Sequence, residues 1–255
     1  MREHIVPYCL ATLALGVVAI AFRDLPLMPQ RLPAGVAHAP VGLLCGTMLL
    51  IAGVAALTPR FSRVAMAALS GLLVGYVMLI PLPAALRSPL NAGAWLGVAE
   101  IGGIAAGAVA LFGVTSGRAT LARTAQIVFG LCALEFALCH FVYVDITASM
   151  VPDWLPHRTM WAYITGMGHA AAGVALVVGV RARLASFLEA AMCAGFVVMV
   201  HLPLVAGSPG SQREWSALAT ALAIAAAALA VGQIGDSVAR RRRHKDPRRA
   251  YEAVG

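Results

Sequence analysis

Charged side chains are scarce in this sequence. Asp, Glu, Lys and Arg make up 12% of the 255 residues, which is about half the share found in ordinary soluble domains. Apolar residues make up 60%, and the mean hydropathy is +0.84. This composition excludes a water-soluble globular domain, and it indicates an integral membrane protein.

Cysteine pairs and phosphate-binding loops are also lacking. The cysteines lie singly in apolar segments and form no Cys-x-x-Cys pair: Cys9, Cys45, Cys132, Cys139 and Cys193. A thiol centre that reduces disulfides needs such a pair, so we interpret these residues as small buried hydrophobes. The glycine-rich stretches follow no strand, which excludes a nucleotide phosphate loop.

Eight apolar segments are long enough to cross a bilayer, which takes roughly 17–25 residues each. They are Ile5–Phe22, Pro40–Leu57, Val64–Ile80, Ala94–Val114, Ala125–Tyr143, Met160–Val180, Ala185–Leu204 and Trp215–Ile234. All are rich in Ala, Leu and Gly, and none shows the ten-residue alternation of a membrane barrel, so we expect an all-α protein with eight transmembrane helices. No small-x-small cleavage site follows the first segment before Arg23, so we expect it to be a retained helix and not a signal peptide.

The cations predict the orientation. If the N-terminus is inside, 14 of the 19 Lys and Arg residues lie on the inner side, seven of them in the tail after residue 237. Cytoplasmic loops carry the excess of Lys and Arg, so we expect both termini in the cytoplasm of a bacterial-type inner membrane. The cations lie in the loops and tail, a pattern that indicates contact with anionic lipid and not with nucleic acid.

An internal repeat organises the chain. A shift of 120 residues, with no gap, aligns Arg63 with Arg183, Trp95 with Trp215, and Leu82-Pro83 with Leu202-Pro203. We therefore expect two four-helix repeats, residues 1–119 and 120–236, and a basic cytoplasmic tail, residues 237–255. An even number of helices per unit makes the repeats parallel, because both enter the membrane from the same side. Glycines at helix-packing spacing, including Gly71, Gly75 and Gly173, predict close contacts between helices.

Ionisable residues inside the apolar segments mark the candidate site. Such residues are costly in lipid and usually face a partner or a cavity. In the second half they are His140, His169, His201 and Glu135, and the 120-residue shift aligns them with Ile20, Leu49, Pro81 and Ala14. Glu100 has the opposite pattern, since its counterpart is Thr220. The first repeat lacks most of these groups, so they predict a site built mainly in the second half.

Helical rise places these groups in the outer half of the bilayer. At about 1.5 Å per residue, His140 and His201 lie within about 5 Å of the outer ends of their segments, Glu100 roughly 8 Å down and His169 roughly 12 Å down. A polar loop with Asp145, Asp153 and His157 lies above them, and Trp161 and Tyr163 are candidate walls. Glu189 lies near the inner end of its segment, where we expect an ion pair with Arg183.

Three interpretations of this set are open. The first is a structural network, in which His and Glu bond across helices and the tryptophans form an interfacial belt. The second is a quinone-type pocket, in which His or Tyr binds a carbonyl oxygen and a carboxylate relays a proton. The third is a metal or haem held by His140, His169 and His201.

The second half resembles the DoxX-like membrane proteins from about Phe129 to Pro203. The matching elements are His140-Phe141, Val151-Pro152-x-Trp154-Leu155-Pro156, Trp161-x-Tyr163-x-Thr165-Gly166, Ala172-Gly173 and His201-Leu202-Pro203. Members of this family are four-helix units that often occur singly. The family takes its name from a subunit associated with a thiosulfate:quinone oxidoreductase, and the resemblance implies a membrane or extracytoplasmic redox partner.

Our leading expectation is a redox-associated membrane subunit that binds a quinone or similar hydrophobic ligand near the outer leaflet. The alternatives are a small-solute or ion carrier coupled to protons through Glu135 and Glu100, and a structural module without catalysis that stabilises a partner.

Overall fold

The computed structural model describes residues 2–25 and 37–234, and regular structure in these ranges is helical throughout. The elements of the first half are α1 (Arg2–Phe22), α2 (His38–Leu57), α3 (Ser62–Leu79), α4 (Pro81–Arg87) and α5 (Ala92–Ser116). Those of the second half are α6 (Ala119–Val142), α7 (Val144–Met150), α8 (Arg158–Val178), α9 (Ala182–Phe196), a π-helical turn η1 (Val197–His201), α10 (Leu202–Gly207) and α11 (Gln212–Gly232).

The expected all-α class and the expected number of apolar spans are confirmed. Within the described residues, eight helical stretches are long and apolar enough to cross a membrane. The seventh stretch runs over Ala182–Gly207 and is longer than expected, because α9, η1 and α10 follow one another without a break. The expected basic tail and Arg31 lie outside the described residues.

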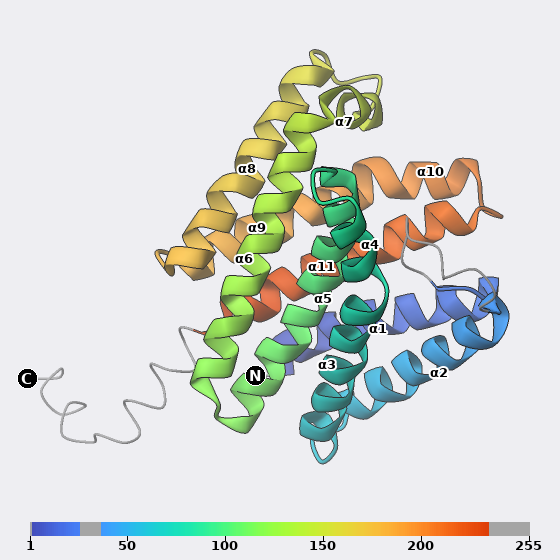
Figure 1. Ribbon diagram of the computed structural model, residues 1–255, viewed down its shortest axis with the longest axis vertical. Coiled ribbons are helices and arrows are strands. Elements are labelled where there is room, and N and C mark those ends of the chain that lie inside the picture. Colours follow the sequence, from blue (N-terminus) through green and yellow to red (C-terminus); the bar gives the residue numbers. More distant parts are fainter. Residues whose placement is uncertain (1, 26–36, 235–255) are drawn as a thin grey trace, which may run out of the picture.

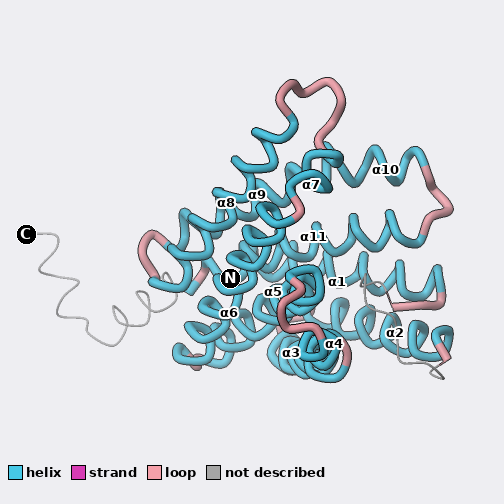
Figure 2. The backbone as a smooth tube through the Cα atoms, turned by 45° about the horizontal axis from the view of Figure 1, so that its top comes forward, coloured by secondary structure: helices cyan, strands magenta, loops and turns pink. Residues whose placement is uncertain are grey.

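Two helices form the centre of the bundle. Residues of α5 and α11 are 67% and 72% buried over their most apolar windows, against 28% for α2. In Figure 1 the pair α6 and α8 lies on one side of α5 and α11, and the pair α1 and α2 on the other. Figure 2 shows the same pairs from another direction, with α3 and α4 beside α5. Every other span packs, directly or through one neighbour, on this central pair.

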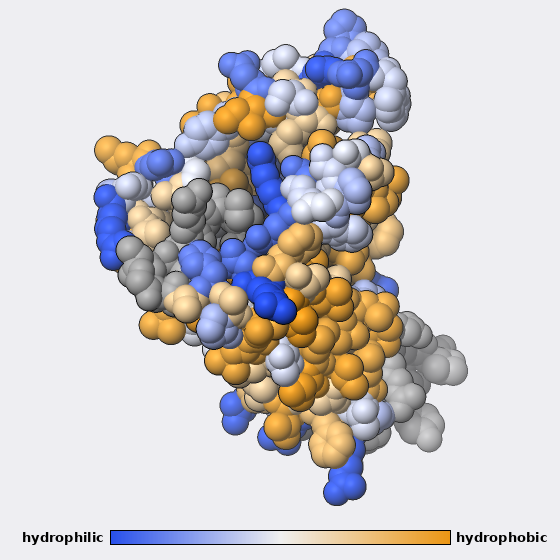
Figure 3. Space-filling view, turned by 90° about the vertical axis from the view of Figure 1, so that its right-hand side faces the viewer, coloured by the Kyte–Doolittle hydropathy of each residue, from blue (hydrophilic) through white to orange (hydrophobic). Residues whose placement is uncertain are grey.

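Small residues point inward and large apolar residues point outward. In α2 the buried side includes Gly42, Gly46 and Gly53, whereas Leu44 and Ile51 are 62% and 66% exposed. Figure 3 shows a broad continuous apolar area on one face of the molecule. Soluble helices bury their large apolar side chains, and helices in lipid instead pack through small residues. This distribution fits a surface that contacts lipid tails.

Glycine pairs let the backbones of neighbouring helices approach closely. A Cβ added to Gly130 of α6 or Gly173 of α8 would lie within 3 Å of the other residue's carbonyl oxygen. In the centre, a Cβ on Gly107 of α5 would lie 2.7 Å from both Tyr8 and Ala227. The expectation for Gly71 and Gly75 is wrong, since nothing lies within 4 Å of a Cβ at either position.

This difference gives a matched test. Gly173→Ala should lower the thermal unfolding temperature in detergent, because its methyl group collides with the Gly130 carbonyl and with Leu134. Gly71→Ala should leave that temperature unchanged or raise it, because Ala favours a helix over Gly by about 1 kcal/mol and the site is open. Equal destabilisation by both changes would contradict the assigned α6–α8 contact.

Candidate functional site

Helix α6 presents polar groups on two of its faces. Phe136 and His140 lie on the face toward α8 and α9, while Glu135 and Cys139 lie on the face toward α5. The close approach of α8 creates the first of these contacts, because a Cβ on Gly166 would lie 2.9 Å from the Cβ of His140. The sequence therefore folds into two separate polar clusters and not one.

The first cluster is built on a buried pair, His169 of α8 and Glu189 of α9. The Nδ1 atom of His169 lies 2.7 Å from Oε1 of Glu189, and the two residues are 3% and 1% exposed. The second carboxylate oxygen, Oε2, is buried and has no hydrogen-bond partner. A buried carboxylate that is only half satisfied is costly, and such groups in native structures usually have a functional or structural reason.

His140 lies directly beside this pair. Its ring centroid is 4.9 Å from that of His169, and the Phe196 and Phe136 rings complete an aromatic surround. The Nδ1 atom of His140 lies 2.9 Å from the Phe136 carbonyl oxygen. A carbonyl oxygen only accepts, so Nδ1 carries the proton and the Nε2 atom of the neutral ring is left as an acceptor. Because His140 is half-buried, the cluster extends from the bundle interior toward its surface.

The pair lies deeper than the expected outer-half position. His169 is eleven residues from the start of α8 and nine from its end, which is roughly 16 Å and 14 Å along the axis. Glu189 is seven residues, or about 10 Å, into α9. A hydrogen-bonded carboxylate and imidazole therefore lie near the middle of the bundle.

The expected ion pair between Glu189 and Arg183 is wrong, since Glu189 bonds to His169. A signal in the sequence favours the observed position. The buried residues of α9 recur at helical spacing, namely Ala185, Ser186, Glu189, Ala190 and Cys193. The 120-residue shift also aligns Glu189 with Leu69, which is fully buried, as it aligns His169 with the buried Leu49.

The second cluster lies between α5 and α6. Cys139 donates from Sγ to Oε1 of Glu135 at 3.5 Å and to the Ala92 carbonyl at 3.7 Å. Glu100 of α5 lies within electrostatic range of the same thiol. Glu135 and Glu100, both candidate site residues, thus lie at one interface. This interface is on the opposite side of α6 from His140.

His201 does not join either cluster. It is the last residue of η1, where the π-helical turn precedes Pro203, and its Nδ1 atom is buried without a hydrogen-bond partner. The ring contacts of His169 in the described structure are to Phe136, His140 and Phe196, not to His201. Among the described residues, no group of three or more His, Cys, Asp and Glu side chains is arranged to hold a metal ion. In the described structure, His140 and His169 thus lie side by side, while His201 has no ring contact with either.

The remaining candidates lie at the surface or apart from the pair. Asp145, Asp153 and His157 are exposed, and Asp153 forms an ion pair with Arg158. Tyr163 is 45% exposed and stacks with Phe141, and it is not among the ring contacts of His169. Trp161 is half-buried, and its indole nitrogen has no partner. The aromatic walls of the first cluster are thus Phe136 and Phe196, which the sequence analysis did not select.

The cysteines form no disulfide. All five are free, four of them are buried and Cys45 is half-buried. This agrees with their interpretation as small hydrophobes.

No protein-family model, curated protein or solved structure matches this chain. The chemistry assigned to the site below therefore comes from its own residues.

The buried pair can be tested against its counterpart in the first half. His169→Ala leaves the Glu189 carboxylate without its one hydrogen bond, and breaking a buried pair in this way costs about 3–5 kcal/mol of unfolding free energy. Changing both residues, His169→Leu with Glu189→Leu, copies Leu49 and Leu69, and such apolar replacements are often neutral or stabilising. Thermal unfolding in maltoside should show a large loss for the single variant and recovery in the double variant. A double variant as unstable as the single one would mean that the pair is needed for folding.

Proposed function

We propose that this chain is an integral membrane protein made of two parallel four-helix repeats. Three pairs of first-half and second-half helices support this proposal, because their first residues are 120 apart. They are α2 (His38) with α8 (Arg158), α3 (Ser62) with α9 (Ala182), and α5 (Ala92) with α11 (Gln212). The packing partners correspond in the same way. Helix α1 packs on α2 and α11, and α6, its counterpart in the second half, packs on α8 and α5. Trp95 and Trp215 also make the same bond, each donating from its indole nitrogen to the carbonyl of the proline six residues earlier.

The proposed orientation has both termini in the cytoplasm of a bacterial-type inner membrane. It is supported by the excess of Lys and Arg on one side of the spans. The lipid-facing surface is supported by the exposed apolar side chains of α2 and its neighbours.

We propose further that the first cluster binds a quinone or a similar lipid-soluble ligand with hydrogen-bonding oxygens. One observation carries this proposal: a half-buried imidazole, His140, lies beside a buried imidazole–carboxylate pair that keeps one oxygen unpartnered. The first half has only aliphatic residues at the positions of these three groups, Ile20, Leu49 and Leu69. A purely architectural role would be needed in both repeats, so their confinement to one repeat favours a ligand.

Each residue of the cluster has a distinct task in this proposal. His140 holds its Nδ1 proton against the Phe136 carbonyl, which leaves Nε2 to bond the ligand oxygen. The His169–Glu189 pair supplies an imidazole and a carboxylate beside that ligand, which are the groups that general acid–base transfer uses. Phe136 and Phe196 provide an apolar surround that suits a flat ring. When bound, a quinone supplies reversible two-electron, two-proton chemistry, with its electrons exchanged with a partner subunit.

The resemblance to DoxX-like membrane proteins also implies a redox partner in the membrane or outside the cytoplasm. His140-Phe141 and Gly166 belong to the matching elements, and in the structure Gly166 lies against His140 and Phe141. The proposed role is therefore a redox-associated subunit in which this chain supplies the ligand site and the proton-holding groups.

A second candidate function is a proton-coupled carrier, and the second cluster favours it. Glu135 has only a thiol as a hydrogen-bond donor, and Glu100 forms none of the hydrogen bonds or ion pairs found in the described residues. Carboxyl groups so placed inside a bundle are typical of proton relays. In this case Glu100→Gln would abolish transport in proteoliposomes, whereas His140→Ala would leave it intact.

Quinone binding to the full chain in lipid nanodiscs tests the leading proposal. A short-chain benzoquinone should quench the tryptophan fluorescence of the wild type with one saturable site. His140→Ala should weaken binding about tenfold, the value of one net hydrogen bond. His169→Leu with Glu189→Leu should remove the proton uptake that accompanies reduction of the bound quinone by an added reductant.

His157→Asn is the matched control, because it removes an exposed histidine and Asn tolerates the left-handed backbone at this position, φ 56°. It should bind as the wild type does. Absence of saturable binding in the wild type, or equal weakening by His140→Ala and His157→Asn, would refute the quinone site and leave the carrier proposal to be tested.

A further inference from the structure

Helix α7 and the turn that follows it leave large apolar side chains uncovered at the ends of two apolar spans. Between α6 and α8 the chain forms α7 (Val144–Met150) and a turn over residues 151–157. Helix α7 packs mainly on α8. Figure 1 shows it at the end of the α6–α8 pair that lies away from α1 and α2. The connection therefore lies against the ends of the spans that it joins.

The surface of α7 is divided into three strips. One strip is buried or half-buried against the protein: Val144, Thr147 and Ala148. At 3.6 residues per turn, the exposed positions form two further strips side by side. One is polar and consists of Asp145 and Ser149, and the other is apolar and consists of Ile146 and Met150, which are 62% and 44% exposed. Helix α7 is thus amphipathic along the part of its surface that the protein leaves uncovered.

The apolar strip belongs to a longer series of exposed apolar residues. From the last turns of α6 to the turn after α7, an exposed apolar side chain occurs at every fourth position: Leu138, Val142, Ile146, Met150 and Trp154. Trp154 is the most exposed of them, at 71%. An ion pair between Asp153 and Arg158 fixes the turn that carries it. The indole is therefore held on the outside of the protein.

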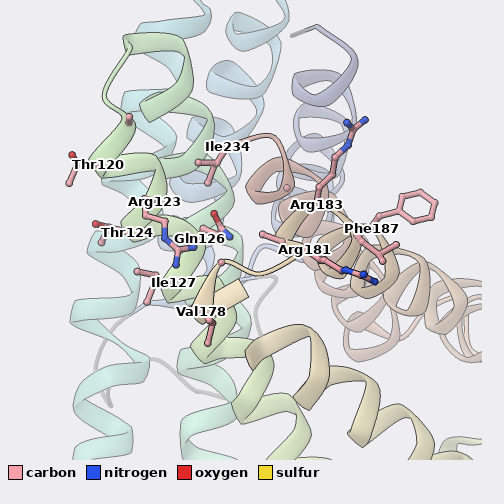
Figure 4. A pocket seen from close by; sticks show the side chains of 15 residues that line it. Thr120, Arg123, Thr124, Gln126, Ile127, Val178, Arg181, Arg183, Phe187 and Ile234 are labelled. Carbon is pink, nitrogen blue, oxygen red and sulfur yellow. The ribbon is translucent and has the colours of Figure 1, made fainter. Parts of the chain in front are cut away.

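The length of α8 places α7 at one surface of a membrane. Arg123 of α6, with Arg181 and Arg183 at the start of α9, lines a cavity where α6 begins and α8 ends (Figure 4). Helix α8 runs from the α7 connection to that cavity over 21 residues, which is about 30 Å. This length matches the hydrocarbon core of a bilayer. The basic residues at one end and α7 at the other thus lie where hydrocarbon gives way to head groups.

We propose that α7 and Trp154 lie in the head-group layer of the membrane. The apolar strip and the indole face the acyl chains, and the polar strip faces water. Amphipathic helices bind lipid surfaces in this way, and tryptophan is enriched at this level because one end of its ring system is apolar and the other polar. A lipid surface accounts for the separation of the two strips, because it covers one and leaves the other in water.

This placement also fixes the depth of the first cluster. His140 lies four residues before the start of α7, which is about 6 Å along α6. Its ring then lies just below the head groups, at a depth that a lipid-soluble ligand reaches from within the bilayer. The placement rests on the membrane insertion proposed above and needs none of the quinone chemistry.

Tryptophan fluorescence of the full chain in phosphatidylcholine nanodiscs tests the placement. Ile146→Trp adds an indole to the apolar strip, and Ser149→Trp is the matched control on the polar strip. The added emission, measured as the difference from the wild type, should be quenched at Ile146 by lipids brominated near the head group and protected from aqueous iodide. At Ser149 iodide should quench it and the brominated lipids should not. The emission lost in Trp154→Phe should behave as that of Ile146→Trp does.

Two further positions calibrate the measurement. Leu131→Trp, in the middle of α6, reports contact with acyl chains, and Leu90→Trp, in the fully exposed α4–α5 connection, reports water. Lipid contact at Leu131 with iodide access on both strips would overturn the placement and leave the surface to a soluble partner. Protection of Ile146 from both quenchers would also overturn it, because a second copy of the chain would then cover the apolar strip. Iodide access at Leu131 would overturn the membrane insertion itself, so the two failures are distinguishable.

Discussion

The structure depends on how closely its helices can approach one another. Lipid tails are as apolar as leucine, so burying large apolar side chains gives little gain, and contact between backbones at small residues takes its place. Gly130 with Gly173, and Gly107 with Ala227, are such contacts, and they leave no room for even one methyl group. The central pair α5 and α11 is built mostly from Ala and Gly for the same reason. The large apolar residues are then free to cover the outside.

This packing also explains why the ionisable groups in the bundle interior are informative about function. In an interior made of Ala and Gly, an ionisable side chain is stabilised by a partner at the same depth, and His169 with Glu189 is a pair of that kind. The first half shows that the scaffold does not require it, because Leu49 and Leu69 occupy the aligned positions and are buried. The departures from the repeat are therefore where function is best sought, and the first cluster is a departure of this kind.

The sequence predicted the coarse fold well and the site only in part. Long runs of Ala, Leu and Gly predicted the eight spans, because a long apolar composition is sufficient to indicate a membrane-spanning helix. Gly71, Gly75 and Gly173 were all selected for helix-packing spacing, but of these only Gly173 faces another helix. Spacing does not say which side of a helix meets a neighbour. His140 and His169 were selected as buried ionisable groups, yet their neighbours Phe136, Phe196 and Glu189 come from two different helices, α6 and α9. Which of these residues meet depends on how the helices rotate in the bundle. The π-helical turn before Pro203 was not foreseen either, since a proline in an apolar run requires some irregularity but does not specify which.

The free cysteines make the chain convenient for chemical labelling. Four of the five thiols are buried between helices, and Cys45 alone is half-buried. Water-soluble maleimides react with thiolates that solvent can reach, so the folded protein should react very little with them. After Cys45→Ala it should not react at all. A single new cysteine in any connecting loop would then be the only reactive thiol. Its labelling from one face of a sealed vesicle would report directly which compartment that loop faces.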